Sequence, residues 1–377
     1  MAALVSLVKA PAYDYRIVYD AVKYAVDLLG GMDRFVKPGE RVLLKPNLLS
    51  SEAAEKAVTT HPIIVKAVIQ MVREAGGRPV VGDSPGLFSM GKVAKNTGIK
   101  HVCDEMDVKL VEFSPSVLVR PEGNALFKQL EIAKIAIEAD KVVNLPKLKT
   151  HSQMLLTLGV KNLFGCIEGK RKAVWHLKAG IDRKAFAAML VEIYRTVSPV
   201  LTILDGIVGM EGDGPGNGIP RNIGLIAGSS DAVALDVIIS EILGVKREKL
   251  LTGVAARQMG VGETIFENID ILGEKIEDVK VDNFKLPSIS GLEMFPRFTY
   301  SFLRNALTTK PKINKEKCIL CQSCRDKCPP GIISWDKDGP SIDYPHCIYC
   351  FCCHEICPAG AVEIKPGWAL KFFKFII

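Results

Sequence analysis

The sequence of 377 residues is long enough for two or more domains, and its 48% hydrophobic and 24% charged residues exclude a disordered chain, because this composition lets a globular protein bury a large core. Its net charge of +7 is spread along the chain without a block of like charges, so it favours acidic partners or anionic substrates and does not indicate nucleic-acid binding. No stretch approaches the roughly 18 consecutive apolar residues of a membrane span.

The first 286 residues alternate short β-rich runs with amphipathic helical stretches, which is typical of parallel strands joined by crossover helices. The segment 1–9 is interpreted as a first strand and not as an export signal. Further strands are predicted at 41–45, 79–82, 109–113, 141–145, 201–204, 223–227 and 269–272. Helices are predicted at 61–75, 182–197 and 231–243, where apolar residues recur on one stripe. The expected fold of residues 1–286 is an α/β domain with a mostly parallel sheet and flanking helices.

Small and charged residues follow four of the predicted strands. Lys45 ends the strand at 41–45, Asp83 follows the next one, the segment 146–151 follows the strand at 141–145, and Asp205 closes the strand that begins at 201. Ligands of open α/β sheets bind outside the carboxyl ends of the strands. We therefore predict one shared functional site, formed by Lys45, Asp83, Lys147, Lys149, His151 and Asp205.

Each part of this predicted site permits more than one chemistry. The lysines can bind carboxylate or phosphate, or lose a proton beside another cation and serve as base or nucleophile; otherwise they are surface lysines. His151 can move protons or bind a metal, or be a structural residue. The carboxylates at 83, 205, 211 and 213 can bind a divalent cation or form Asx-type turns. The glycine-rich segment 206–218 lets backbone approach a ligand but lacks the order of a nucleotide-binding fingerprint.

Eight of the eleven cysteines form two identical runs with the spacing C-x2-C-x2-C-x3-C-P, 29 residues apart. This spacing holds a pair of [4Fe–4S] clusters, and the fourth cysteine of each run binds the other cluster. Two identical four-part runs fit neither a structural zinc site nor a disulfide scaffold. The predicted ligands of one cluster are Cys318, Cys321, Cys324 and Cys357, and those of the other are Cys347, Cys350, Cys353 and Cys328.

The remaining cysteines have other predicted roles. Cys352 lies between ligands and is expected to face the shell of a cluster, while Cys103 and Cys166 are expected to be buried small apolar residues. Reduced thiolates and the lack of an export signal predict a cytoplasmic protein.

Residues 311–366 resemble the bacterial two-cluster ferredoxins, with every ligand position filled and Pro329 and Pro358 matching the pattern. The repeat extends past the cysteines, because the segment from Gly331 aligns with the segment from Gly360. A small α+β ferredoxin-like domain is expected here, joined to the first domain by a linker at 287–310. The apolar, aromatic tail at 367–377 is expected to dock internally, with a membrane-surface contact as the alternative.

The first domain also resembles a known family. Its motifs are Lys45-Pro-Asn, Thr60-His-Pro, Gly82-Asp-Ser-Pro-Gly, Pro146-Lys-Leu-Lys-Thr-His, Gly159-Val-Lys-Asn-Leu-Phe-Gly and Asp205-Gly with Glu211-Gly. In this order they resemble the DUF362 family, a domain of unknown function that is often fused to a ferredoxin module, over residues 3–280. The resemblance implies this domain arrangement and little about the reaction. A remoter similarity, to the DUF2088 domain of nickel-dependent lactate racemases, is suggested by the alternating architecture and the basic strand ends.

Taken together, these features predict an iron–sulfur oxidoreductase. Its ferredoxin domain would pass low-potential electrons from two [4Fe–4S] clusters to a small anionic substrate or cofactor, which the lysines bind while His151 with Asp83 or Asp205 supplies protons. A redox partner protein would donate the electrons. The alternatives are an electron carrier or adaptor whose first domain docks a partner enzyme, and a metal or cofactor delivery protein.

Overall fold

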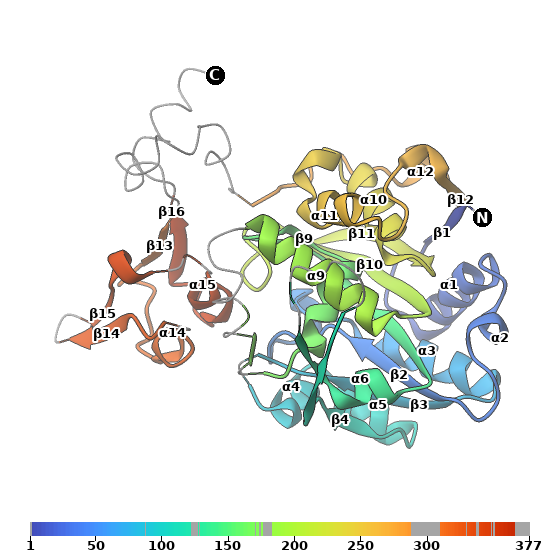
Figure 1. The fold of residues 1–377 in the computed structure, drawn as a ribbon, viewed down its shortest axis with the longest axis horizontal. Coiled ribbons are helices and arrows are strands. Elements are labelled where there is room, and N and C mark those ends of the chain that lie inside the picture. Colours follow the sequence, from blue (N-terminus) through green and yellow to red (C-terminus); the bar gives the residue numbers. More distant parts are fainter. Residues whose placement is uncertain are drawn as a thin grey trace.

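The computed structural model describes residues 2–86, 88–121, 127, 129–169, 171–172, 175, 183–287, 310–328, 330–336, 339–347, 349 and 351–365. Most of the predicted linker, the predicted tail at 367–377 and the predicted ligand Cys350 lie outside these residues. Within them, the chain forms an α/β domain and a smaller ferredoxin-like domain beside it (Figure 1). None of the helices in these ranges has both the length and the apolar character needed to cross a lipid bilayer.

A ten-stranded, mostly parallel sheet forms the centre of the α/β domain. Its strands follow one another in the order β12 (Ile269–Gly273), β1 (Ala3–Lys9), β11 (Ile219–Ser229), β10 (Leu201–Glu211), β7 (Lys141–Leu145), β2 (Arg41–Pro46), β3 (Arg78–Asp83) and β4 (Leu110–Glu112). Strand β11 is antiparallel to both neighbours, and the other pairs along this path are parallel. A branch leaves the path where β8 (Lys147–His151) pairs in parallel with β10 and antiparallel with β9 (Leu155–Thr157).

Helices cover both faces of this sheet. One face carries α1 (Tyr15–Asp27), α2 (Met32–Phe35), α3 (Pro62–Glu74), α4 (Met90–Asn96) and α5 (Ile99–Glu105). The other carries α6 (Lys134–Glu138), α7 (Gly159–Asn162), α9 (Arg183–Val197), α10 (Ala232–Ile242), α11 (Leu251–Met259) and α12 (Ile276–Val279). Successive residues of β2 alternate between the two layers, because Val42 and Leu44 pack with α1 and α3 while Leu43 packs with α9 and α11.

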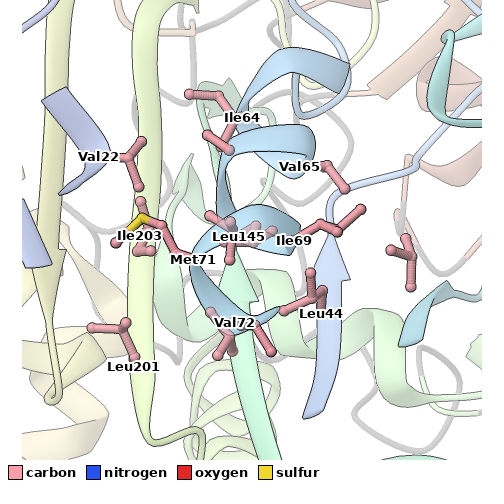
Figure 2. Close-up of a cluster of buried hydrophobic side chains, with 14 of the residues drawn as sticks. Val22, Leu44, Ile64, Val65, Ile69, Met71, Val72, Leu145, Leu201 and Ile203 are labelled. Atoms are coloured by element: carbon pink, nitrogen blue, oxygen red, sulfur yellow. The ribbon is translucent and has the colours of Figure 1, made fainter. Parts of the chain in front are cut away.

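Helix α3 illustrates how local sequence and packing combine. Pro62 occupies its first turn, and the side chain of His61 accepts a hydrogen bond from the Ile63 amide at 3.3 Å, so the helix begins where its sequence predicts. Its apolar stripe packs onto three strands, as Figure 2 shows for the side chains Leu44, Leu145, Leu201 and Ile203. Burying one such side chain completely stabilises the fold by about 1.5–3 kcal/mol.

Each predicted strand and helix of this domain has a counterpart in the structure, which also contains strand β9 and helices such as α1, α5 and α11 that were not predicted, and which departs from the prediction in three further places. The segment 147–151, expected to be a loop, is the strand β8, and all five of its residues are buried. Strand β10 continues to Glu211, so Asp205 lies inside the strand and not at its end. A hairpin of β5 (Ser116–Val119) and β6 (Leu130–Ala133) was not predicted. Charged side chains made the segment 147–151 resemble solvated loop, because their buried partners are distant in sequence.

The ferredoxin-like domain consists of two copies of one unit, in agreement with the 29-residue repeat of the sequence. The first copy contains β13 (Lys310–Ile313), α14 (Ser323–Asp326) and β14 (Ile333–Asp336), and the second contains β15 (Gly339–Ile342), α15 (Cys352–Ile356) and β16 (Val362–Lys365). Strand β13 pairs antiparallel with β16, and β14 with β15, so each small sheet takes one strand from each copy. Figure 1 shows α15 on the side of this domain that faces the α/β domain.

The backbone between the cysteines repeats as well. Leu320 and Gln322 have positive φ angles of 56° and 62°, and the equivalent residues Tyr349 and Phe351 have 51° and 59°. Non-glycine residues seldom adopt this left-handed conformation. Its recurrence at the same two places of each run shows that both runs fold into one loop geometry, as the resemblance to two-cluster ferredoxins implies.

Candidate functional site

A cavity of about 350 Å³ lies between the α/β domain and the ferredoxin-like domain, and we call it the lysine-lined cavity. Four lysines of the α/β domain line it, which are Lys45, Lys149, Lys161 and Lys172. Asp83 and His151 line it as well, so four of the six residues predicted from the strand ends share one wall. The ferredoxin-like domain closes the cavity with residues 326–328 and with Cys352 and Glu355 of α15.

Lys45 and Asp83 form a buried ion pair in the cavity wall, with 2.8 Å between Nζ and Oδ1. Oδ2 of Asp83 also accepts a hydrogen bond from the Leu48 amide at 2.7 Å, and Oδ1 accepts one from the Ser84 amide at 2.8 Å. Gly165 packs so closely that a Cβ at this position would lie 2.3 Å from Oδ1 of Asp83 and 2.4 Å from Nζ of Lys45. Asp83 therefore neutralises and positions Lys45.

Lys149 is held by neutral acceptors. Its Nζ donates to Oδ1 of Asn47 at 2.9 Å and to the carbonyl of Val58 at 2.6 Å, although its side chain is almost fully buried. Asn47 in turn donates to Oδ1 of Asn162 at 2.8 Å. Burial, together with the charge of Lys161, holds the pKa of Lys149 well below its usual value. A buried lysine of this kind is ready to gain charge when an anion enters the cavity.

Lys161 and Lys172 complete the group of cations. Nζ of Lys161 lies 5.1 Å from the ring centre of Phe164 and 5.7 Å from that of Phe186. Lys172 donates a hydrogen bond to the carbonyl of Ser84. Burial lowers the pKa of Lys161. Burial also lowers the pKa of Lys172 to about 8, and the positive charges of Lys45 and Lys161 lower it in the same direction.

His151 connects the two domains. Its Nδ1 accepts hydrogen bonds from the amides of Gln153 at 3.1 Å and Met154 at 3.2 Å, which places the ring hydrogen on Nε2. Nε2 lies 3.2 Å from Oε1 of Glu355, on helix α15. Burial raises the pKa of Glu355, against the charge of Lys161. The backbone of α15 makes a second contact, because the side chain of Asn217 donates to the carbonyl of His354 at 3.0 Å.

Lys147 and Asp205 are not among the residues that line the cavity, which corrects the prediction of one shared site. Nζ of Lys147 lies 2.9 Å from Oδ2 of Asp205, and both side chains are buried. The hydroxyl of Tyr13 accepts from Lys147 and donates to Asp205, at 2.6 Å in each case, and the His61 amide donates to Asp205 at 2.9 Å. The His61 ring stacks on Tyr13, with 3.7 Å between ring centres. This compact network anchors β8 and the start of α3.

Three of the four carboxylates considered as divalent-cation ligands pair instead with cations of the chain. Asp83 pairs with Lys45, Asp205 with Lys147, and Glu211 with Arg221, with 2.6 Å between Oε2 and the guanidinium in the last case. Within the described ranges, these carboxylates form no cluster of three that can hold a metal ion.

The cysteine-rich segments surround a second, smaller cavity. Its lining includes one complete predicted ligand set, Cys318, Cys321, Cys324 and Cys357. Burial raises the pKa of Cys324, and the three other thiols of this set raise it further, as expected where the four sulfurs lie near one another. The Ala361 amide donates to the sulfur of Cys357 at 3.1 Å. Such amides stabilise the negative sulfur of a bound cluster.

The described members of the other set lie apart from this small cavity. Cys347 and Cys353 both raise the pKa of the Tyr344 hydroxyl, after the larger effect of burial, so they lie near the same ring. Cys328 lines the lysine-lined cavity, and so does Cys352, which was expected to face only a cluster shell. Cys103 and Cys166 are buried, as predicted.

Sequence reasoning missed several members of the cavity wall, among them Lys161, Lys172 and Glu355. Lys161 lies inside the motif at 159–165 and could have been found there, because the glycine that ends this motif packs on the Lys45–Asp83 pair. Lys172 lies outside all the motifs identified in the sequence. Glu355 lies between two cysteines of the second run, and only the docking of the two domains brings it to the lysines.

Comparison with known proteins agrees with this division of the chain. Residues 42–241 match the model of the domain of unknown function DUF362, and residues 310–358 match a 4Fe-4S dicluster domain. The thylakoid-associated protein sll1697 of Synechocystis sp. is 43% identical over 289 residues, which are 77% of this chain and 89% of that protein.

Two solved structures are similar in part. The lactate racemase apoprotein from Thermoanaerobacterium thermosaccharolyticum is 14% identical with a TM-score of 0.40, over 62% of this chain and 55% of that one. A protein from Thermotoga maritima is 14% identical with a TM-score of 0.36, over 59% of this chain and 56% of that one. The chain thus spans just over half the length of each of these two proteins.

Proposed function

Because the chain belongs to the DUF362 family and carries a 4Fe-4S dicluster domain, we propose that it is an iron–sulfur oxidoreductase. Low-potential electrons pass from two [4Fe–4S] clusters to an anionic substrate or cofactor in the lysine-lined cavity. A reduced redox partner protein supplies two electrons, one to each cluster. The anion takes up these two electrons together with two protons.

One observation carries this proposal, which is that Cys328 lines the same cavity as the lysines. Cys328 is a predicted ligand of the cluster that Cys347, Cys350 and Cys353 hold, so an anion bound by the lysines would lie against the shell of that cluster. The fusion of the two domains keeps electron donor and acceptor at a high effective concentration.

The residues in and around the cavity have different roles in the proposed reaction. Lys45 and Lys149 bind and polarise the anion, and Asp83 holds Lys45 in place. His151, a neutral imidazole whose ring hydrogen lies on Nε2, donates a hydrogen bond at the edge of the cavity, and ammonium groups of the wall lysines supply the two protons. Lys147 and Asp205 support β8 from outside the cavity. The bound clusters supply the one-electron chemistry, and the chain's own residues bind and orient the acceptor.

The proposal is tested with anaerobically purified protein. Untargeted mass spectrometry of the released small molecules should identify a retained organic anion, and the dithionite-reduced clusters should lose their electrons to it in a stopped-flow measurement. Lys149→Met should weaken retention at least tenfold at unchanged iron content, since a charge-assisted contact contributes about 1.5–3 kcal/mol. Lys246→Met, which removes an exposed lysine outside the cavity, is the control. Unchanged ligand retention and electron flow in Lys149→Met would favour the docking alternative.

The two-cluster assignment has its own test. Iron and sulfide analysis should give about eight of each per chain, because each predicted set fits a four-iron cluster. Cys328→Ser should damage the cluster of Cys347, Cys350 and Cys353, and leave the EPR signal of the other after dithionite reduction. Cys103→Ser, at a buried cysteine outside both sets, should leave both signals unchanged. About four iron per chain in the wild type would contradict the assignment.

A second candidate is an electron carrier whose α/β domain docks a partner enzyme. The name of the Synechocystis relative, which describes a thylakoid-associated protein, supports it. A membrane contact through residues 367–377 and a cytoplasmic location both stay predictions. Sedimentation with liposomes distinguishes the two locations. A carrier that binds a membrane surface sediments with the vesicles, and deletion of residues 367–377 abolishes the sedimentation.

A further inference from the structure

We propose that the lysine-lined cavity takes a small organic dianion, and that Lys161 recognises its second negative charge. This inference rests on the proposed function in one respect, because it takes this cavity as the place where the electron acceptor binds. It adds the charge, the size and the apolar character of that ligand, and a residue that selects it.

The charges of the cavity wall indicate that the ligand carries two negative charges. Among the lining residues that the structure describes, five are lysines, at positions 45, 149, 161, 172 and 327, and three are carboxylates, at positions 83, 326 and 355. Asp83 is taken by Lys45 at 2.8 Å, and Asp326 is hydrogen-bonded to Arg325 at 3.0 Å. With the lysines protonated, the described lining residues therefore carry at least two more positive than negative charges, which a dianion compensates.

Lys161 is the cation best placed to meet the ligand. Lys45, Lys149 and Lys172 each have a hydrogen-bonding or ionic partner in the wall. Among the described residues, by contrast, no oxygen lies within hydrogen-bond or ion-pair distance of the Lys161 ammonium, which lies over the rings of Phe164 and Phe186 while the charge of Glu355 acts on it from a greater distance. A cation held over aromatic rings in a cavity keeps its donors available for an incoming anion.

The electrostatics of the four lysines support the same assignment. The charge of Lys161 lowers the pKa of both Lys149 and Lys172, so Lys161 lies close enough to repel both of these cations. Burial and this repulsion make Lys149, Lys161 and Lys172 easier to deprotonate in the free protein. A dianion reverses the repulsion and raises these pKa values. Binding should therefore take up protons from solution.

The size and the apolar parts of the wall define the rest of the ligand. A volume of about 350 Å³ lies at the lower end of the range for small-molecule sites, which is about 300–1,000 Å³. Phe164, Leu48, Leu49 and Pro215 add apolar surface between the charged groups. A single ring or a short carbon chain that carries two negative charges, as a dicarboxylate or a phosphate monoester, fits this combination.

The test compares anions of equal shape and unequal charge. Phenyl phosphate carries two charges at pH 8, since its second pKa is about 6, whereas phenyl sulfate has the same outline and one charge. Phthalate and its monoamide, phthalamate, form a second pair of similar outline, with two charges and one charge. Binding to the oxidised holoprotein is measured by calorimetry at constant ionic strength. We expect at least tenfold tighter binding of a dianion than of its matched monoanion in at least one pair; equal affinities within both pairs would overturn the proposal.

Lys161→Met tests the selecting residue. This variant should bind the dianion at least tenfold more weakly and the monoanion with little change, so that the preference disappears. Lys246→Met, with the same loss of charge on an exposed part of the chain, should retain the wild-type preference. The urea midpoint reports whether the α/β domain of each variant is folded, and iron content and visible spectrum report on its ferredoxin-like domain. A preference retained in Lys161→Met would refute the role of this lysine.

A measurement on the wild-type protein keeps the proposal testable if that variant does not fold. Calorimetry at pH 8 in two buffers of different ionisation enthalpy should show net proton uptake with phenyl phosphate, and binding without uptake would count against the proposal. All these experiments use oxidised protein without a reductant. If a dianion binds but is never reduced, only the proposed function is contradicted. If monoanions are reduced and Lys161 is not needed for this, only the present inference is contradicted.

Discussion

Nε2 of His151 lies 3.2 Å from Oε1 of Glu355, and this contact joins the last residue of β8 to helix α15 of the ferredoxin-like domain. The same imidazole accepts two backbone hydrogen bonds through Nδ1, from Gln153 and Met154. One ring therefore fixes the turn after β8 and presents a donor to the other domain. The wall of the cavity and the docking of the cluster domain depend on the same side chain.

His151→Ala should destabilise both the turn and the domain contact. Two buried amides lose their acceptor, and each unsatisfied group costs about 1–3 kcal/mol. Hydrogen exchange at Gln153 and Met154 should accelerate, and the urea midpoint of the anaerobic holoprotein should fall. His101→Ala, at an exposed histidine of α5, is the matched control and should leave both measurements unchanged. Equal behaviour of the two variants would show that the His151 contacts contribute nothing.

Gly165→Ala should disrupt the Lys45–Asp83 pair. The new Cβ would lie 2.3 Å from Oδ1 of Asp83, closer than any van der Waals contact permits, so the pair must separate or the backbone must move. We expect a loss of about 1–3 kcal/mol in unfolding free energy and weaker retention of the anion. Gly91→Ala in α4 meets no atom within 4 Å and should be neutral or slightly stabilising. Urea titration of both variants checks this.

Lys147→Met should affect stability and not ligand binding. It leaves Asp205 buried without its cation, and breaking a buried ion pair in this way costs about 3–5 kcal/mol. The double variant Lys147→Met with Asp205→Asn should recover part of the loss, because the uncompensated charge is gone. Chemical denaturation and calorimetry separate the two effects. If Lys147→Met abolished anion binding at wild-type stability, the strand-end residues would form the single unit predicted from the sequence.

Asp236 should make stability depend on pH. Burial raises its pKa from 3.8 to about 8, although its two oxygens accept hydrogen bonds from the amides of Gly159 at 2.7 Å and Val160 at 3.1 Å. Between about pH 4 and pH 8 the folded chain keeps a proton that the unfolded chain has lost. The stabilisation that comes from protonated Asp236 is fully present below about pH 4 and is lost as the pH rises through about 8. The unfolding free energy therefore falls across this window.

Asp236→Asn tests that linkage. The amide cannot ionise, so the variant should lack this part of the pH slope, at the cost of one hydrogen bond and hence a lower stability at every pH. The measurement is the urea midpoint of the anaerobic holoprotein from pH 5 to pH 8. A variant slope identical to that of the wild type would mean that Asp236 does not titrate in this range.

Much of the fold could be predicted because its signals are local. Apolar stripes defined α3 and α9, β-rich runs defined most of the sheet, and the 29-residue repeat even implied that the strands of the ferredoxin-like domain recur. The strand β8 could not be predicted in this way. Four of its five residues are polar and buried, and three of them, Lys147, Lys149 and His151, have the partners Asp205, Asn47 and Glu355 from three distant segments.

The candidate site was predicted in part for a related reason. Strand ends of a parallel sheet share one edge, so Lys45, Asp83, Lys149 and His151 could be grouped from the sequence. Asp205 was misplaced because β10 runs six residues beyond it. The far wall of the cavity depends on how one domain docks on the other, and no local pattern encodes that geometry.

The exchange of strands between the two copies of the ferredoxin-like unit bears on how the chain is made. The ribosome releases Lys310–Ile313 about fifty residues before its partner Val362–Lys365, and it releases three cysteines of the first run long before Cys357. A nascent chain that ends between the copies has neither closed sheet nor four thiolates for one cluster. Cluster insertion must therefore wait until the second copy has been made, and a chain truncated between the two copies should lose both clusters together.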